Sequence, residues 1–361
     1  MKILSKTFLG LDGFTTYPHM NGYVDGGRAL VYMRTFADTR NLFLRDLESG
    51  EEKELAAFDK ELEGSCWDIA LNTRRLAMVL SNQAWIMDLD HPEDMKVIYT
   101  PDDTCKLDTL CSLTPDGRRL LCGEVRGALN VAIEIDVETG EVRDLFSKRW
   151  HANHFHYCPH DDRWVAFSHE GKTEEIPDRC WVWHAEHAPE GKCAFDQASD
   201  TPGVLLCVGH ERWGFHDVSG YAPAYAHSPA GNRGLYEIFA DGRPAKLVWK
   251  SDVIWHCSMD LTGRYVAVDT AGPIRDEPYT EKEYAEHLAY FKKHDQAKIP
   301  IFGDVAILDL ETQDFVYVAS ARWSKHPFHP HPAISPDARW VAWNDFNPEK
   351  KGIWLAEIEY S

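Results

Sequence analysis

The stretch PDARWVAW, from Pro336 to Trp343, is the clearest copy of the pattern that decides the fold: a short polar turn followed by an apolar strand. Six other stretches repeat it in varied form, and most copies begin roughly 45 residues after the one before. The seven copies begin at Asp25, Asn72, Pro115, Asp161, Asp217, Thr262 and Pro336. This spacing is the length of one four-stranded blade of a β-propeller. Seven copies therefore predict an all-β protein, a seven-bladed β-propeller.

Each copy is followed by a further strand in which apolar and polar residues alternate, ending in an Asp/Gly turn, as in residues 133–140. Alternation bounded by such turns is typical of hairpins. The last copy reaches Tyr360 after only its third strand. We expect the outer strand of that blade to come from the N-terminal residues near 6–11, because closure of this kind leaves no open edge. Residues 1–361 would then form one propeller domain.

The interval between the sixth and seventh copies is longer than one blade requires. It contains a run of good helix formers from Glu281 to Leu288 whose apolar residues follow a helical period. We predict a short helical insertion at about residues 273–300, between blades six and seven. An ordinary solvated loop is the alternative.

Composition restricts the class of protein. The formal net charge of −20 argues against nucleic acid and anionic membrane as partners, since both need a basic face. No stretch approaches the roughly 20 apolar residues that span a membrane, and the first residues lack the apolar run of a signal peptide. The nine cysteines include no C-x-x-C pair, and we interpret them as reduced thiols. We therefore expect a cytoplasmic protein; the sequence leaves the oligomeric state open.

Histidines recur at one position of the repeat, in the segment just before the polar turn. This segment is the innermost strand of a blade, and innermost strands line the central channel. The histidines at this position are His19, His154, His156, His210, His256, His329 and His331. Residues two apart in an extended strand share a face, so His329 and His331 could act as a pair of ligands. Because imidazole binds divalent transition metals, we predict one metal site in the channel; a purely structural channel is the alternative.

With these features the chain resembles the oligogalacturonate lyases of polysaccharide lyase family 22. The resemblance rests on five short segments in order along the chain. They are HEG at 169–171, RCW at 179–181, GHERW at 209–213, HCSM at 256–259, and HPHP at 329–332 followed by SPD at 335–337. The register of the repeat matches along essentially the whole chain, and the five segments together are specific.

The resemblance implies a metal-dependent carbon–oxygen lyase that binds manganese and cleaves short oligogalacturonides, mainly unsaturated digalacturonate, by β-elimination. The partner would be a small acidic oligosaccharide. The implied metal ligands are His256, His326, His329 and His331. His210 would be the base that removes the C5 proton, and Arg179 would bind a substrate carboxylate. We add His154, His156 and His169 as candidate substrate contacts.

The chain departs from the family at three places. His326 stands where the family has Gln, which makes the ligand set all-imidazole and brings Zn²⁺, Ni²⁺ and Fe²⁺ into consideration beside Mn²⁺. Phe14 and Thr15 stand where the family has a His-Arg pair, and residues 150–156 of blade four look rebuilt. Three other functions stay open: a lyase acting on another uronate, such as a glucuronate-containing disaccharide; a non-catalytic binding propeller; and a metal-dependent hydrolase. The hydrolase is disfavoured because the histidine positions offer no carboxylate base.

Overall fold

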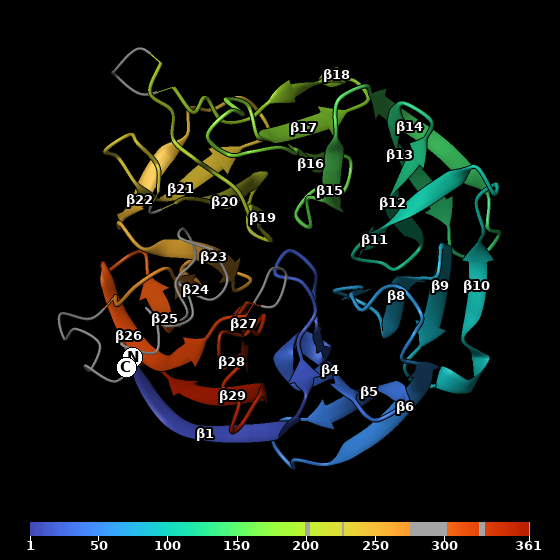
Figure 1. Ribbon diagram of the computed structural model, residues 1–361, viewed down its shortest axis with the longest axis horizontal. Coiled ribbons are helices and arrows are strands. Elements are labelled where there is room, and N and C mark those ends of the chain that lie inside the picture. Colours follow the sequence, from blue (N-terminus) through green and yellow to red (C-terminus); the bar gives the residue numbers. More distant parts are fainter. Residues whose placement is uncertain (199–202, 226, 275–301, 325–328, 361) are drawn as a thin grey trace.

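The computed structural model of the protein describes residues 1–361 except 199–202, 226, 275–301, 325–328 and 361. Its strands form seven antiparallel sheets that follow one another in a ring around a central axis (Figure 1). The predicted seven-bladed propeller is therefore confirmed. Helical structure in the described residues is limited to two 3₁₀ turns, η1 (Asp25–Gly27) and η2 (Pro92–Asp94). The insertion predicted at about 273–300 lies almost entirely outside the described residues.

Each blade runs from an innermost strand near the axis to an outermost strand at the rim (Figure 1). Blades one to three contain β2 (Gly13–Phe14), β3 (Tyr23–Val24), β4 (Ala29–Thr35), β5 (Thr39–Asp46) and β6 (Glu52–Asp59); β7 (Trp67–Ile69), β8 (Arg75–Leu80), β9 (Gln83–Asp88) and β10 (Lys96–Tyr99); and β11 (Cys105–Leu113), β12 (Arg119–Arg126), β13 (Leu129–Asp136) and β14 (Val142–Lys148). Blades four and five contain β15 (Ala152–Tyr157), β16 (Val165–His169), β17 (Cys180–His184) and β18 (Ala188–Cys193); and β19 (Arg212–Trp213), β20 (Ser219–Ala224), β21 (Gly234–Phe239) and β22 (Lys246–Lys250). Blades six and seven contain β23 (Ile254–Met259), β24 (Tyr265–Thr270), β25 (Phe302–Asp309) and β26 (Asp314–Arg322); and β27 (Ala333–Ile334), β28 (Trp340–Asp345), β29 (Gly352–Glu359) and β1 (Lys2–Leu11).

The polar turn of the repeat is held by side chains that the pattern itself supplies. In blade three, Asp116 Oδ1 accepts hydrogen bonds from the Thr114 hydroxyl (2.7 Å) and from the Arg118 N–H (3.1 Å). Gly117 has a φ of +68°, in the left-handed region that favours glycine. Because these local hydrogen bonds satisfy the turn, each copy of the pattern can form its own hairpin next to the axis.

The ring is closed by the two ends of the chain. β1 pairs with β29 in antiparallel register, from Lys2 opposite Glu359 to Leu11 opposite Gly352. The N- and C-termini consequently lie side by side at the rim (Figure 1). Blade seven is thus built from residues at both ends of the sequence.

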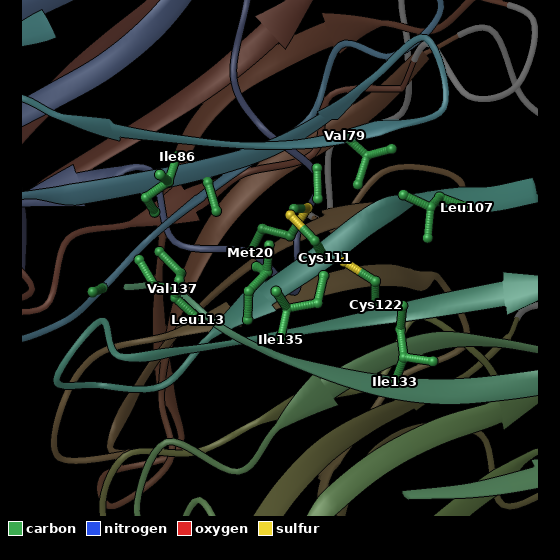
Figure 2. Close-up of a cluster of buried hydrophobic side chains, with 14 of the residues drawn as sticks. Met20, Val79, Ile86, Leu107, Cys111, Leu113, Cys122, Ile133, Ile135 and Val137 are labelled. Carbon is green, nitrogen blue, oxygen red and sulfur yellow. The ribbon is translucent and has the colours of Figure 1, made fainter. Parts of the chain in front are cut away.

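The core is divided into hydrophobic clusters between neighbouring blades. Figure 2 shows the cluster between blades two and three, which contains Val79 and Ile86 from blade two and Leu107, Cys111 and Ile133 from blade three. Burying one such aliphatic side chain contributes about 1.5–3 kcal/mol. Packing between blades therefore holds the innermost strands in place around the axis.

All nine cysteines are free thiols, and most of them are buried. None of the described residues forms a helix with the length and apolar character needed to cross a lipid bilayer.

Candidate active site

Three buried histidines from blades six and seven form a cluster near the axis. His256 comes from β23, and His329 and His331 come from the segment that leads into β27. Each histidine offers one ring nitrogen, and these three atoms lie within 4.8 Å of one another. The exposed fractions are 0% for His256, 1% for His329 and 5% for His331. The structure therefore brings together three of the four histidines predicted as ligands; His326, the fourth, lies outside the described residues.

Asp269 on β24 orients this cluster. His256 Nδ1 donates to the Asp269 carboxylate, with both oxygens at 2.8 Å, and Asp269 Oδ2 also accepts the backbone N–H of His331 (3.1 Å). With its hydrogen on Nδ1, neutral His256 keeps a lone pair on Nε2, and this buried atom has no hydrogen-bond partner among the described residues. A carboxylate that fixes the tautomer in this way is the usual outer support of a metal-bound histidine. The three imidazoles thus fit a divalent transition metal.

His210 lies directly beside the cluster. Its ring centroid is 4.1 Å from that of His256, and its φ of +53° is in a region that residues with side chains seldom adopt. Burial, followed by His256 and Arg179, lowers the pKa of His210 well below its usual value. Its ring is therefore neutral near pH 7, the state that a general base needs, while the lowered pKa makes it a weaker base.

Tyr17, from the segment between β2 and β3, is the hydrogen-bond partner of His210. The Tyr17 hydroxyl lies 2.9 Å from His210 Nδ1. Burial raises the pKa of Tyr17, so its hydroxyl keeps its hydrogen.

A cavity of about 670 Å³ opens beside His210. Its lining includes Tyr17, Asp108, His154, Glu170, Arg179 and His210. This volume is within the range of about 300–1,000 Å³ that is usual for small-molecule sites. A second hollow, of about 760 Å³, lies between blades four and five and contains none of the predicted site residues.

Buried Arg179 and partly buried Glu170 form an ion pair on the wall of the cavity. Arg179 Nη2 and Nη1 donate to the two oxygens of Glu170 at 2.7 and 3.0 Å. Burial opposes ionisation of Glu170, but His154 and Arg179 outweigh burial and lower its pKa. Arg179 Nε has no hydrogen-bond partner among the described residues. Glu170 therefore fixes the plane of the guanidinium and leaves several of its five N–H groups for other acceptors.

The other three predicted substrate contacts, His154, His156 and His169, lie in three different places. His154 lines the cavity, whereas His156 lines a small separate pocket toward the C-terminal ends of the innermost strands. Period-2 alternation would put these two residues on one face. However, β15 is bulged between Asn153 and His156, and His154 has a φ of +56°, so the two side chains diverge. His169 lines neither space; its Nδ1 lies 2.9 Å from Asp178 Oδ1, and its ring packs on Trp150.

Tyr17, Asp269 and Asp108 were not singled out from the sequence. Tyr17 had a usable signal, because it precedes His19 by two residues in the innermost segment of blade one. Asp269 lies on the second strand of its blade, where the repeat offers no hint that a carboxylate turns toward the axis.

The comparisons with known proteins agree with this architecture. No family model matches the chain. An oligogalacturonate lyase from Dickeya dadantii (strain 3937) is 22% identical over 261 residues, which cover 63% of this chain and 55% of that protein. The aligned part of the chain thus spans little more than half the length of this relative.

Two solved structures match nearly the whole chain. The crystal structure of an oligogalacturonate lyase from Vibrio parahaemolyticus has a TM-score of 0.78 and 18% identity, with 98% of this chain and 93% of that chain covered. An oligogalacturonate lyase in complex with manganese has a TM-score of 0.78 and 16% identity, with 99% and 95% covered. These findings confirm the resemblance seen in the sequence: the chain has the propeller fold of the oligogalacturonate lyases, at low sequence identity to them.

Proposed function

We propose that the protein is a metal-dependent lyase that cleaves short oligouronides, such as unsaturated digalacturonate, by β-elimination. One observation carries the proposal: a buried cluster of three imidazoles lies in contact with a neutral fourth histidine, His210, at a cavity that also contains Arg179. A binding propeller has no need of this combination. The similarity to oligogalacturonate lyases supports the same reaction class.

The reaction must remove a weakly acidic proton. The C5 proton of a uronate is α to a carboxylate, and its loss adds negative charge to a group that is already anionic. A metal held by His256, His329 and His331, with His326 as the proposed fourth ligand, would supply Lewis-acid stabilisation of that charge when bound. His210 accepts the C5 proton as general base.

Arg179 is proposed to orient the substrate. Its guanidinium is held in one plane by Glu170, and its remaining N–H groups can donate to a carboxylate oxygen of the sugar. His154 on the same wall is proposed to contact sugar hydroxyls. We also propose His156 and His169 as substrate contacts, although neither residue lines this cavity.

Mn²⁺ is the metal we propose first, because a structural neighbour is an oligogalacturonate lyase in complex with manganese. An all-nitrogen ligand set also suits Zn²⁺, Ni²⁺ and Fe²⁺. We further propose a cytoplasmic location, since nine free cysteines fit a reducing compartment.

One feature of the cavity favours a second candidate, a lyase acting on a different uronate disaccharide. Among the charged residues that line the cavity, Asp108 and Glu170 offset Lys106 and Arg179. Digalacturonate carries two carboxylates. The divalent metal would take one of them, and the balance of side-chain charges leaves no surplus cation for the second. A uronate linked to a neutral sugar would meet the same site with one charge fewer.

The test uses protein loaded with Mn²⁺ and compares three variants. His256→Ala should lose bound metal in elemental analysis. His210→Ala should keep the metal but lose about a hundredfold or more in turnover, because the general base acts in the transition state. His91→Ala, whose side chain is 67% exposed on the surface, is the control and should behave like wild type.

The substrates are digalacturonate and a glucuronate-containing disaccharide, with the products separated by chromatography. Near-normal turnover by His210→Ala would contradict the assignment of the base. If the metal-loaded wild-type protein cleaves neither compound, we would interpret the protein as a non-catalytic binding propeller and not as an enzyme.

A further inference from the structure

Asp108 enters the cavity from blade three, across the axis from the metal cluster. Blades six and seven, which supply the three clustered histidines, lie on the opposite side of the ring (Figure 1). β11 pairs with β12 up to Leu107 and again from Cys111, and the register shifts between these two residues. A shift of this kind re-aims the side chains within it. Residues 108–110, which lie in the shift, all line the cavity.

The Asp108 carboxylate is not used by the rest of the described structure. It forms no hydrogen bond and no ion pair with any of the described residues. Its pKa, raised to about 6 by burial and then by Glu170, still leaves the group mostly ionised at pH 7. A cavity that we propose to bind acidic sugars thus has an unpaired carboxylate on its wall.

A disaccharide bound at the metal would extend toward Asp108. The uronate that loses its C5 proton must lie beside His210 on blade five, close to the metal cluster. Its O4 carries the second sugar, which leaves when the bond between C4 and O4 breaks. From His210, the lining of the cavity runs through blade four to residues 64–66 and 106–110, at the innermost strands of blades two and three. The leaving sugar would therefore lie at this end.

A carboxylate at this end suits hydroxyl groups and opposes a second carboxylate. Ionised Asp108 can only accept hydrogen bonds, and two neighbouring hydroxyls of a sugar can donate to its two oxygens. A carboxylate on the leaving sugar would meet a like charge, which lowers affinity. We propose that Asp108 selects a substrate whose leaving sugar is neutral, a uronate with an uncharged sugar on O4. The inference rests on the β-elimination proposed above and favours the second candidate substrate.

Lys106 does not reverse this selection. It lies two residues before Asp108 and also lines the cavity, but 68% of its side chain is exposed. Its Nζ lies 3.5 Å from Glu63 Oε2, so a surface carboxylate already shares its charge. Arg179 is paired with Glu170 and is assigned to the reacting uronate. The described residues at the Asp108 end of the cavity thus offer a second carboxylate no cation of its own.

The test uses two disaccharides that differ in one group. Digalacturonate and galactosyl-galacturonate share the reacting uronate, but the leaving sugar of the second has a hydroxymethyl group in place of the carboxylate. We expect kcat/KM of the Mn²⁺-loaded wild type to be at least about tenfold higher for galactosyl-galacturonate. If the wild type cleaves glucuronate instead, the same pair is made with glucuronate as the reacting sugar.

Asp108→Asn keeps the shape of the side chain and removes its charge. We expect this variant to bring the two kcat/KM values to within about threefold of each other, chiefly by raising the value for digalacturonate, because the like charge is gone. Asp103→Asn is the matched control, at an exposed position before the same strand, and should keep the wild-type ratio.

The ratio of the two kcat/KM values decides the inference. A wild type that cleaves digalacturonate as well as the neutral-sugar compound, or better, overturns the role of Asp108. An unchanged ratio in Asp108→Asn, at equal Mn²⁺ content, also overturns it, since other groups would then make the selection. If the wild type cleaves no compound of either pair, the proposed β-elimination itself fails, and the selection fails with it.

Discussion

Asp108 lies on the wall of the cavity and packs so closely over Gly123 that a Cβ at that glycine would lie 2.1 Å from Asp108 Oδ2. Burial, followed by the charge of Glu170, raises the pKa of Asp108 to about 6. In the unfolded chain the same carboxyl group ionises near pH 4. The folded protein therefore holds this proton more tightly than the unfolded chain does, and ionisation of Asp108 destabilises the fold.

We predict that Asp108→Asn becomes more stable relative to wild type as pH rises from about 4 through about 6, because the variant has no charge to bury. Two pKa units correspond to about 2.7 kcal/mol, and partial exposure of the side chain reduces the expected gain to about 2 kcal/mol. Urea unfolding at several pH values measures the difference. Asp103→Asn, at an exposed position before the same strand, is the control. A difference between Asp108→Asn and wild type that does not change with pH would contradict the prediction.

At the scale of elements, β1 is the strand whose loss should matter most. It covers β29, and Leu9 within it is buried in a cluster with Ile353 and Leu355. Without β1, the N–H and C=O groups of β29 become an exposed sheet edge, which is prone to pair with other chains.

We expect deletion of residues 2–9 to lower the melting temperature by at least about 4 °C and to cause aggregation that increases with protein concentration. Thermal unfolding and light scattering measure the two effects. A peptide of residues 1–11 added to the deleted protein should restore part of the stability, and the same peptide with Thr7→Pro should not, since proline cannot donate to the ladder. Equal melting temperatures for the full-length and deleted proteins would show that blade seven is stable without its outer strand.

At the scale of the whole molecule, the net charge of −20 opposes the approach of an acidic substrate. The Debye length falls from about 30 Å at 0.01 M ionic strength to about 8 Å at 0.15 M, so salt should weaken this repulsion. We predict that kcat/KM for digalacturonate rises severalfold over this range of NaCl. The monomethyl ester, with one charge fewer, should show a smaller rise. A fall in kcat/KM with salt would mean that the local field of Arg179 and the metal outweighs the global charge.

Only part of this structure could be predicted from the sequence. The blades were predictable because each turn is built from its own residues, such as Thr114, Asp116 and Gly117, so the pattern repeats wherever the fold does. The position of the histidines near the axis followed from the same repeat. The direction of individual side chains did not, because the bulge at His154 breaks the alternation of side chains along β15.

The pairing of Tyr17 with His210 was also beyond the sequence. The two residues are 193 positions apart and belong to different blades, and no repeat relates one to the other. Contacts of this kind depend on the diameter and closure of the ring, which are properties of the assembled molecule.

The closure of blade seven by β1 has a consequence for the order of events during translation. β1 leaves the ribosome before every other strand, and its partner β29 is made after all of them. While the intervening blades are synthesised, β1 must wait unpaired, and His256 is made before His329 and His331 can join it. The ring and the metal cluster are therefore completed together only once blade seven has been made, and a nascent chain interrupted before blade seven would have neither.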